Sequence, residues 1–358
     1  SPSISKDGQW VVHAAVPDRG DPRVLVYSSD GKKRFELASA RDPVISGNGQ
    51  WVAAIMAVPA SELLVSDKGK DEGSKTGLIL LDTRNGEQTR MDSIQSFAFS
   101  NHGNLLAAMH HGNSKKKNGA NDKETGGLSP GNTLSLWDLE KDSKKEIPFV
   151  TSFAFDSISQ HLAYVVADTG TGRNGVYVLD LMDPKTGPLC LFADSSAWGS
   201  DLVWNNPLGK LAFLAGIAGE EGKKDEAALW LWEAGEDRAM EALNDEELEE
   251  GWRIWHSNSL QWSRDGLRLF LGIKPGSEIL LPEEEKPDSL KNLYSTEDIL
   301  AGKQVDVWHW NDPYINPQQK IQWKEEKNRT YTGVYYTDQD QFIPLSGPDM
   351  PEIRTSDN

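Results

Sequence analysis

One short pattern recurs six times along this chain of 358 residues and restricts its fold more than any other feature. Each copy has an apolar lead-in, then Ser, Asp or Asn, then a turn rich in Asp, Asn and Gly, and then an apolar strand. Neighbouring copies are 41 to 58 residues apart, and their first residues are Ile4, Ile45, Phe99, Phe155, Trp204 and Trp262. Such a period is typical of proteins built from repeated supersecondary units.

A second pair of strands follows each lead-in at a matching offset. Its first strand has an alternating pattern that ends in Asp, Trp or a turn, as in residues 23–27, 77–82, 133–138 and 175–180, and the first two of these precede Asp30-Gly31 and Asn85-Gly86. These dipeptides favour hairpins because a type I′ turn needs two residues with positive φ. Each copy therefore predicts four short antiparallel strands. In the sixth copy both 305–310 and 332–336 have strand alternation, and the sequence does not distinguish which is the primary strand.

Repeated four-stranded units predict an all-β fold, a β-propeller in which neighbouring blades cover each other's faces. The expected single domain, 1–358, has blades at approximately 1–40, 41–94, 95–149, 150–197, 198–256 and 257–347, and 348–358 would begin a further blade. The lead-ins at 97–99, 153–155, 202–204 and 260–262 are the expected innermost strands. Their aromatic side chains would pack between blades.

The charge of the chain excludes several partners. It has 37 Lys and Arg against 55 Asp and Glu, a net charge of −18, so nucleic acid and anionic membrane surfaces are not expected to bind. No apolar run is long enough to span a membrane. His110 and His111 are adjacent, so on a strand their rings would point to opposite faces and not share a metal. No metal or other cofactor is therefore expected.

Acidic residues concentrate between residues 220 and 250, where thirteen Asp and Glu stand against three Lys and Arg. The spacing within 237–248 predicts a short helix. Carboxylates here could hold the free amino group of a peptide by charge-assisted hydrogen bonds. The candidate substrate-binding residues are Glu246, Glu247, Glu249 and Glu250. A solvated acidic surface without a ligand is the alternative interpretation.

Several segments together resemble a known family. The Ser-x-Asp-Gly lead-ins, residues 305–312 with their Trp-His-Trp, and residues 328–331 and 342–345 resemble the N-terminal propeller of prolyl oligopeptidase-family serine peptidases. Secreted bacterial dipeptidyl or acylaminoacyl peptidase-like members are the most similar. The resemblance covers the entire chain. It implies seven or eight blades in the parent protein and a following α/β-hydrolase domain that carries the nucleophilic Ser, an Asp and a His.

The chain differs from that family in one respect. A nucleophile elbow needs Gly-x-Ser-x-Gly at a strand-to-helix turn, and the sequence contains no such string. We therefore expect no catalytic residues here, and a non-catalytic propeller that controls how short peptides reach the hydrolase domain of a periplasmic or extracellular peptidase. A stand-alone scaffold that binds a protein or a glycan is the alternative, and a propeller glycosidase is a third. Strand edges left open at Ile4 and Ile353 predict self-association.

Overall fold

The structure is a computed structural model that describes residues 2–18, 20–57, 76–112, 128–168, 170, 172–183, 185–205, 208–219, 224, 226–276, 318, 329–351 and 353. The chain divides into two compact units, Ser1–Ala242 and Leu243–Asn358. The expected single domain over residues 1–358 stays a prediction.

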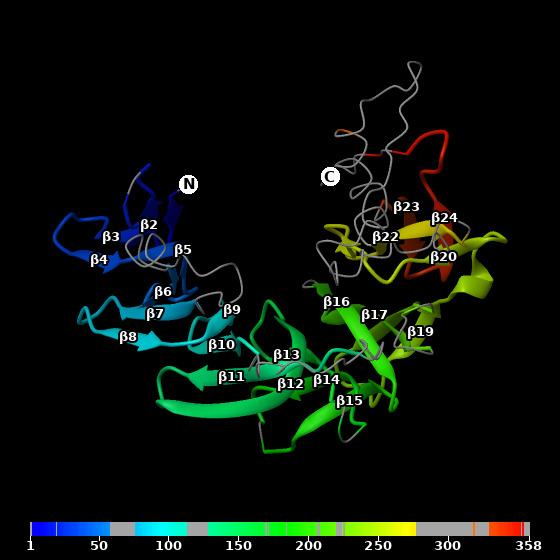
Figure 1. The fold of residues 1–358 in the computed structure, drawn as a ribbon, viewed down its shortest axis with the longest axis horizontal. Coiled ribbons are helices and arrows are strands. Elements are labelled where there is room, and N and C mark those ends of the chain that lie inside the picture. Colours follow the sequence, from blue (N-terminus) through cyan, green and yellow to red (C-terminus); the bar gives the residue numbers. More distant parts are fainter. Residues whose placement is uncertain are drawn as a thin grey trace, which may run out of the picture. The chain divides into compact units, whose positions relative to one another are not determined.

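The first unit consists of antiparallel four-stranded blades, which confirms the predicted blade and the all-β propeller class (Figure 1). Blade one contains β1 (Ser3–Ile4), β2 (Trp10–Ala15), β3 (Arg23–Ser28) and β4 (Arg34–Ala38). Blade two contains β5 (Ala40–Ile45), β6 (Trp51–Met56), β7 (Gly77–Asp82) and β8 (Gln88–Met91). Blade three contains β9 (Ile94–Phe99), β10 (Leu105–His110), β11 (Asn132–Asp138) and the first part of β12 (Ser143–Phe155).

The long strand β12 belongs to two blades. Its first part closes blade three, and its second part opens blade four, so both blades form one seven-stranded sheet. Blade four continues with β13 (His161–Val166), β14 (Gly175–Asp180) and β15 (Pro188–Ala193). Blade five contains β16 (Ala197–Asn205), β17 (Lys210–Ile217), β18 (Ala228–Glu233) and β19 (Met240–Leu243). The first strand of each blade is hereafter its inner strand, and the last is its outer strand.

Apolar clusters join each blade of the first unit to the next. One cluster contains Val24 of blade one and Ile79 of blade two, and another contains Leu80 of blade two and Leu106 of blade three. A third joins blades three and four, and a fourth joins blades four and five around Phe213, whose side chain is fully buried. Each blade of the first unit thus covers an apolar face of the next blade. The blades therefore depend on one another to bury their apolar side chains.

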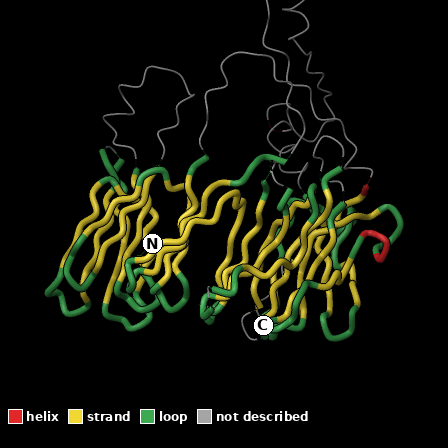
Figure 2. Tube along the Cα trace, turned by 90° about the horizontal axis from the view of Figure 1, so that it is seen from below, coloured by secondary structure: helices red, strands yellow, loops and turns green. Residues whose placement is uncertain are grey.

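Strand direction gives each blade two different ends. Consecutive strands are antiparallel, so the short turns after the first and third strands lie at one end, which we call the turn end. At the other end the second strand ends, the third strand begins and each blade continues into the next, and we call this the link end. Figure 2 shows strands running side by side from one end to the other.

The second unit holds the sixth blade. It contains β20 (Trp252–Ile254), β21 (Gln261–Trp262), β22 (Arg268–Pro275), β23 (Tyr331–Tyr336) and β24 (Gln341–Pro344), preceded by the 3₁₀ turn η2 (Asp245–Glu247). β23 pairs with β22 and is the third strand of this blade, which decides between the two segments that the sequence left open. The other segment, 305–310, lies outside the described residues. Gly347 and Met350 form an isolated bridge, and a further blade over 348–358 stays a prediction.

The predicted helix over 237–248 is wrong. Residues 240–243 form the outer strand β19, which pairs along β18, and only Asp245–Glu247 is helical. Pairing with β18 satisfies the main chain of this segment and buries Leu243, so the tertiary contact overrides the local helical spacing. None of the described segments forms a helix with the length and hydropathy that a membrane crossing requires.

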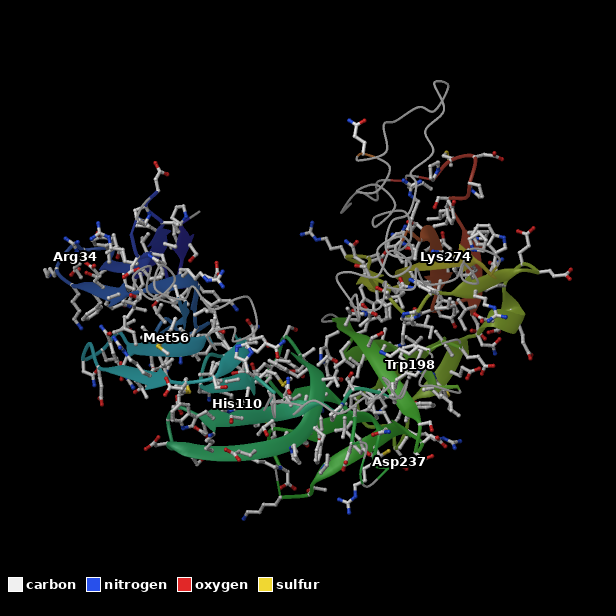
Figure 3. The ribbon with its side chains drawn as sticks, viewed as in Figure 1. Arg34, Met56, His110, Trp198, Asp237 and Lys274 are labelled. Carbon is white, nitrogen blue, oxygen red and sulfur yellow. The ribbon has the colours of Figure 1, made fainter. Side chains whose placement is uncertain are left out.

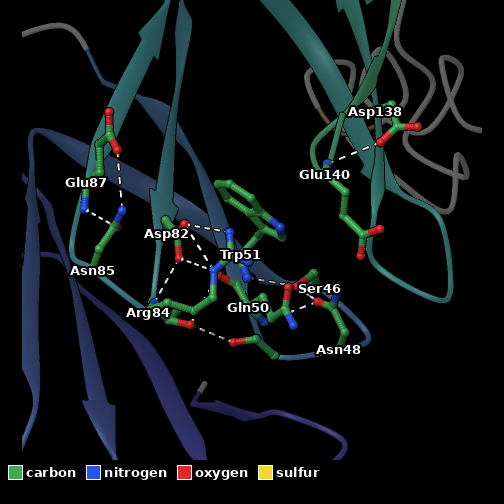
Figure 4. A network of polar contacts seen from close by, with 12 residues as sticks. Ser46, Asn48, Gln50, Trp51, Asp82, Arg84, Asn85, Glu87, Asp138 and Glu140 are labelled. Carbon is green, nitrogen blue, oxygen red and sulfur yellow. Dashed lines mark hydrogen bonds and ion pairs between the residues drawn. The ribbon is translucent and has the colours of Figure 1, made fainter. Parts of the chain in front are cut away.

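The recurring Ser-x-Asp/Asn-Gly signature is a hydrogen-bonded turn between the first two strands. In blade two the Ser46 hydroxyl donates to Asn48 Oδ1 (2.7 Å) and accepts from the Trp51 amide (3.0 Å), as Figure 4 shows. Asn48 Oδ1 also accepts from the Gln50 amide (3.1 Å). Gly49 has a φ of 69°, in the left-handed region that favours glycine. The signature therefore serves turn formation, and it repeats because every blade needs the same turn.

The equivalent turn of blade six lowers the pKa of its aspartate. The Ser263 hydroxyl, the Leu267 amide and the Arg268 side chain donate to the Asp265 carboxylate and lower its pKa to about 2. A pKa lowered by folding contributes stability above the unfolded pKa, and that contribution is lost as the pH falls from about 4 to about 2.

Replacing Ser263 with alanine is therefore expected to raise the pKa of Asp265 toward the ordinary aspartate value, because the carboxylate loses its strongest donor. NMR titration of the Asp265 carboxyl carbon measures this shift. Ser259→Ala is the control, since the Ser259 side chain is not among the donors to Asp265. An Asp265 pKa that stays near its wild-type value in Ser263→Ala would contradict the role given to this hydroxyl.

Candidate functional site

The four predicted glutamates lie in the turn between β19 and β20. Asn244 caps η2 by accepting from the Glu246 amide (2.8 Å), while the Glu247 carboxylate accepts from the Asn244 amide (3.0 Å). This reciprocal pair is a capping box. Glu247 therefore has a structural role in the turn. The neighbouring Asp245 is also engaged, because its Oδ1 accepts from the Ile254 amide (2.8 Å) and fixes the turn to the start of blade six.

The other three predicted residues, Glu246, Glu249 and Glu250, present exposed side chains. Within the described part of the chain, these three carboxylates make no hydrogen bond or ion pair. Solvated carboxylates of this kind can accept hydrogen bonds from a cationic ligand without losing an internal partner. Glu247 is thus engaged in the turn, whereas the carboxylates of Glu246, Glu249 and Glu250 are exposed to solvent. A role in ligand binding stays a prediction for all four residues.

Aromatic residues stand beside this acidic turn at the link end of blade six. Trp252 follows it directly, its amide donating to the Glu249 carbonyl (3.0 Å), and its ring contacts that of Tyr331 edge-on at 5.4 Å between centroids. The Gly276 amide donates to the Gly251 carbonyl (2.7 Å), which joins the turn to the end of β22. The second unit therefore combines exposed negative charge with a fixed aromatic pair.

The inner strands of the first unit carry a second group of polar residues. Register shifts interrupt the pairing of β5, β9, β12 and β16 with their second strands. The residues within these bulges include Asp42, Gln95, Thr151 and Asp201. Asp42 and Asp201 have φ angles of 51° and 53°, which is uncommon for a residue with a side chain. Bulges of this kind often re-aim side chains near functional sites.

The bulged side chains of the inner strands are hydrogen-bonding groups. Asp42, Gln95 and Thr151 are exposed and Asp201 is half-buried. Asp42 pairs with Arg41 (3.2 Å), Gln95 Oε1 accepts from the Asn132 side chain (3.2 Å), and Asp201 accepts from the Ser200 hydroxyl (2.8 Å). Donors and acceptors thus recur on successive inner strands. We call this set the inner polar residues, and they are a candidate surface for an extended polar ligand.

The two adjacent histidines have different hydrogen-bond partners. His110, at the end of β10 in Figure 3, exchanges a hydrogen bond with the Ser135 hydroxyl (2.7 Å), whereas His111 contacts the Thr76 hydroxyl (2.8 Å). Burial and the nearby Lys144 lower the pKa of His110, while Glu146 opposes them. In the described ranges no three His, Cys, Asp or Glu side chains are grouped to hold a metal ion.

Sequence reasoning missed the inner polar residues. A polar residue just before an aromatic lead-in is visible in the sequence, as in Gln95 before 97–99 and Thr151 before 153–155. The bulge itself has no local signal, because it depends on how the inner strand pairs with the second strand. The repeated position of such residues relative to the lead-in is the sequence signal that could have indicated them.

A scan against protein-family models gives no match to this sequence, and a search of curated proteins gives none either. Similar solved structures include the β-propeller domain of the trilobed protease from Pyrococcus furiosus, with 13% identity over 76% of this chain and 77% of that one and a TM-score of 0.39. Uncomplexed acylaminoacyl peptidase from Pyrococcus horikoshii has 13% identity, 76% and 42% coverage and a TM-score of 0.40.

An oligogalacturonate lyase in complex with manganese is similar at the same level, with 8% identity, 76% and 73% coverage and a TM-score of 0.41. The aligned part spans less than half of the acylaminoacyl peptidase chain. Propeller domains of prolyl oligopeptidase-family peptidases are thus among the structures similar to this chain. These TM-scores and identities are too low to support an argument about function. Propellers also occur in proteins with many unrelated activities.

Proposed function

We propose that this chain is the non-catalytic propeller of a secreted or periplasmic serine peptidase, and that it controls how short peptides reach a hydrolase domain of the same protein. The resemblance of its Ser-x-Asp-Gly repeat and of residues 342–345 to the prolyl oligopeptidase family supports the class of protein. The observation that carries peptide binding is the recurrence of the inner polar residues on four successive inner strands.

An extended peptide offers alternating main-chain donors and acceptors. The Gln95 amide and the Thr151 hydroxyl can both donate and accept, so they suit such a ligand without requiring a particular peptide sequence. In the second unit, Glu246, Glu249 and Glu250 have carboxylates that are exposed and unengaged among the described residues, and by themselves they are a candidate site for the free amino terminus of a peptide. Charge-assisted hydrogen bonds would favour a free amino terminus over a blocked one.

The test compares two fluorescent tetrapeptides, one with a free amino terminus and one acetylated, by anisotropy on the purified chain. We expect the free peptide to bind about threefold more tightly, since contacts to exposed carboxylates are weak. In Glu249→Gln/Glu250→Gln this preference should disappear. The control Glu236→Gln/Asp237→Asn changes the charge equally at the turn end of blade five and should keep the preference.

Two results would contradict the proposal. Binding of neither peptide would remove the assigned ligand class, and equal binding of both would remove the role of the glutamates. The alternative of a scaffold for another protein or a glycan would then be the better explanation.

A further inference from the structure

The outer strand of blade four lies at the end of the seven-stranded sheet. β15 pairs with β14 on one side, and no strand of the described chain pairs with its other edge. An unpaired edge presents main-chain donors and acceptors that can pair with another strand.

β15 lacks the protection that the other outer strands have. Its six residues, 188–193, include no charged side chain. The other outer strands either carry charges, at Arg34, Glu36, Arg90, Lys144, Lys145, Glu146 and Glu241, or, in β24, are four residues long and end in Pro344. Charged side chains and prolines on an edge are the usual means of preventing edge-to-edge pairing. β15 has Pro188 at its very start and a register shift at Leu191 against β14, but it carries no charge.

The large apolar side chains of β15 are already packed within the chain, while its exposed side chains are small. Leu191 is 4% exposed in the cluster between blades four and five, and Leu189 and Phe192 pack against that cluster. Cys190 lies opposite Tyr177 in the register with β14. The feature left for a partner is therefore the main chain of this edge, which makes a strand the fitting ligand.

Opposite charges flank β15. Lys185 precedes it, Asp194 follows it, and both side chains are exposed. If a second β15 pairs in the antiparallel direction, the Lys185 end of one strand comes beside the Asp194 end of the other, at both ends of the pair. The same segment is thus complementary to itself, as a twofold-symmetric interface requires.

We propose that two copies of this chain associate through antiparallel pairing of their β15 strands, which continues the seven-stranded sheet of one copy into that of the other. This inference does not depend on the proposed peptidase role. It also differs from association through the open edges at Ile4 and Ile353, because it uses an outer strand in the middle of the first unit.

Sedimentation equilibrium of the full chain tests the interface. We expect a concentration-dependent dimer, and we expect Cys190→Lys to weaken it by about tenfold or more, because the new charge occurs twice in a symmetric pair. The control Thr89→Lys places the same charge on β8, an outer strand that already carries Arg90, and should leave the dimer unchanged.

A second variant tests the same contact without altering the strand. Lys185→Glu places like charges together at both ends of the pair and should also weaken the dimer, whereas Lys145→Glu on the charged part of β12 should not. Circular dichroism confirms that each variant keeps its strand content. A wild-type chain that remains monomeric at about 100 μM, or a dimer that neither Cys190→Lys nor Lys185→Glu weakens, would overturn the proposal.

Discussion

Replacing Phe213 with alanine is expected to lower the free energy of unfolding of the first unit by about 3–5 kcal/mol, as measured by urea denaturation followed by circular dichroism. Phe213 lies in β17 with none of its surface exposed, within the cluster that joins blades four and five. Its removal leaves a cavity that β-sheets, held by their hydrogen bonds, cannot easily close. The loss should therefore be near the upper range for core substitutions.

Ile217→Ala is the matched control for this substitution. Ile217 ends the same strand but is 52% exposed, so its truncation should cost less than about 1 kcal/mol. Each blade is stabilised mainly by contacts with its neighbours. The loss of stability caused by Phe213→Ala should therefore be largest in blades four and five. Equal effects of the two substitutions would show that the cluster between blades four and five does not hold the unit together.

Replacing Asp156 with alanine is expected to cost about 2–4 kcal/mol by the same measurement. The Asp156 carboxylate accepts from the Gln160 amide (2.8 Å) and contacts His161 Nδ1 (3.0 Å), and its side chain is 6% exposed. The His161 ring stacks on Trp204 of blade five and meets Trp232 edge-on. Removal of the carboxylate would leave buried donors without an acceptor and free the ring that joins the two blades.

Asp180→Ala is the control, because it shows how much an aspartate that only accepts hydrogen bonds in a turn contributes to the free energy of unfolding, without a partner such as His161. Asp180 accepts from the Met182 and Asp183 amides in a turn of the same blade, but it is exposed, so its loss should cost about 1 kcal/mol. If Asp156→Ala and Asp180→Ala destabilise the protein equally, the contact with His161 contributes nothing measurable. In that case the aromatic stack would depend on apolar packing alone.

Much of the fold follows from local sequence patterns. The strand alternation of residues 332–336 is visible in the sequence, and this segment forms most of β23. The fourth copy of the repeat, which lacks its glycine, still forms the turn, with Ser159 at a φ of 58° and Asp156 in place of the serine. Turn chemistry acts over a few residues, so the sequence shows it directly.

The candidate site was less accessible to sequence reasoning. The four glutamates could be named from composition, and the Asn244-x-x-Glu247 spacing is a capping-box pattern that assigns Glu247 to the turn. Which of the remaining carboxylates stay unengaged depends on contacts such as that of Asp245 with Ile254, which joins the turn to β20. A list of acidic residues does not contain that information.

The sequence by itself determined the blade, because each turn and each strand is encoded within a few residues by Ser, Asp, Gly and an alternating apolar pattern. Only the tertiary structure decided which polar residues of the inner strands are bulged, which carboxylates remain free and which outer edge is unprotected. These features depend on the register of one strand against the next and on the packing of one blade against another. Register and packing are set by contacts between residues far apart in the chain, so no local pattern records them.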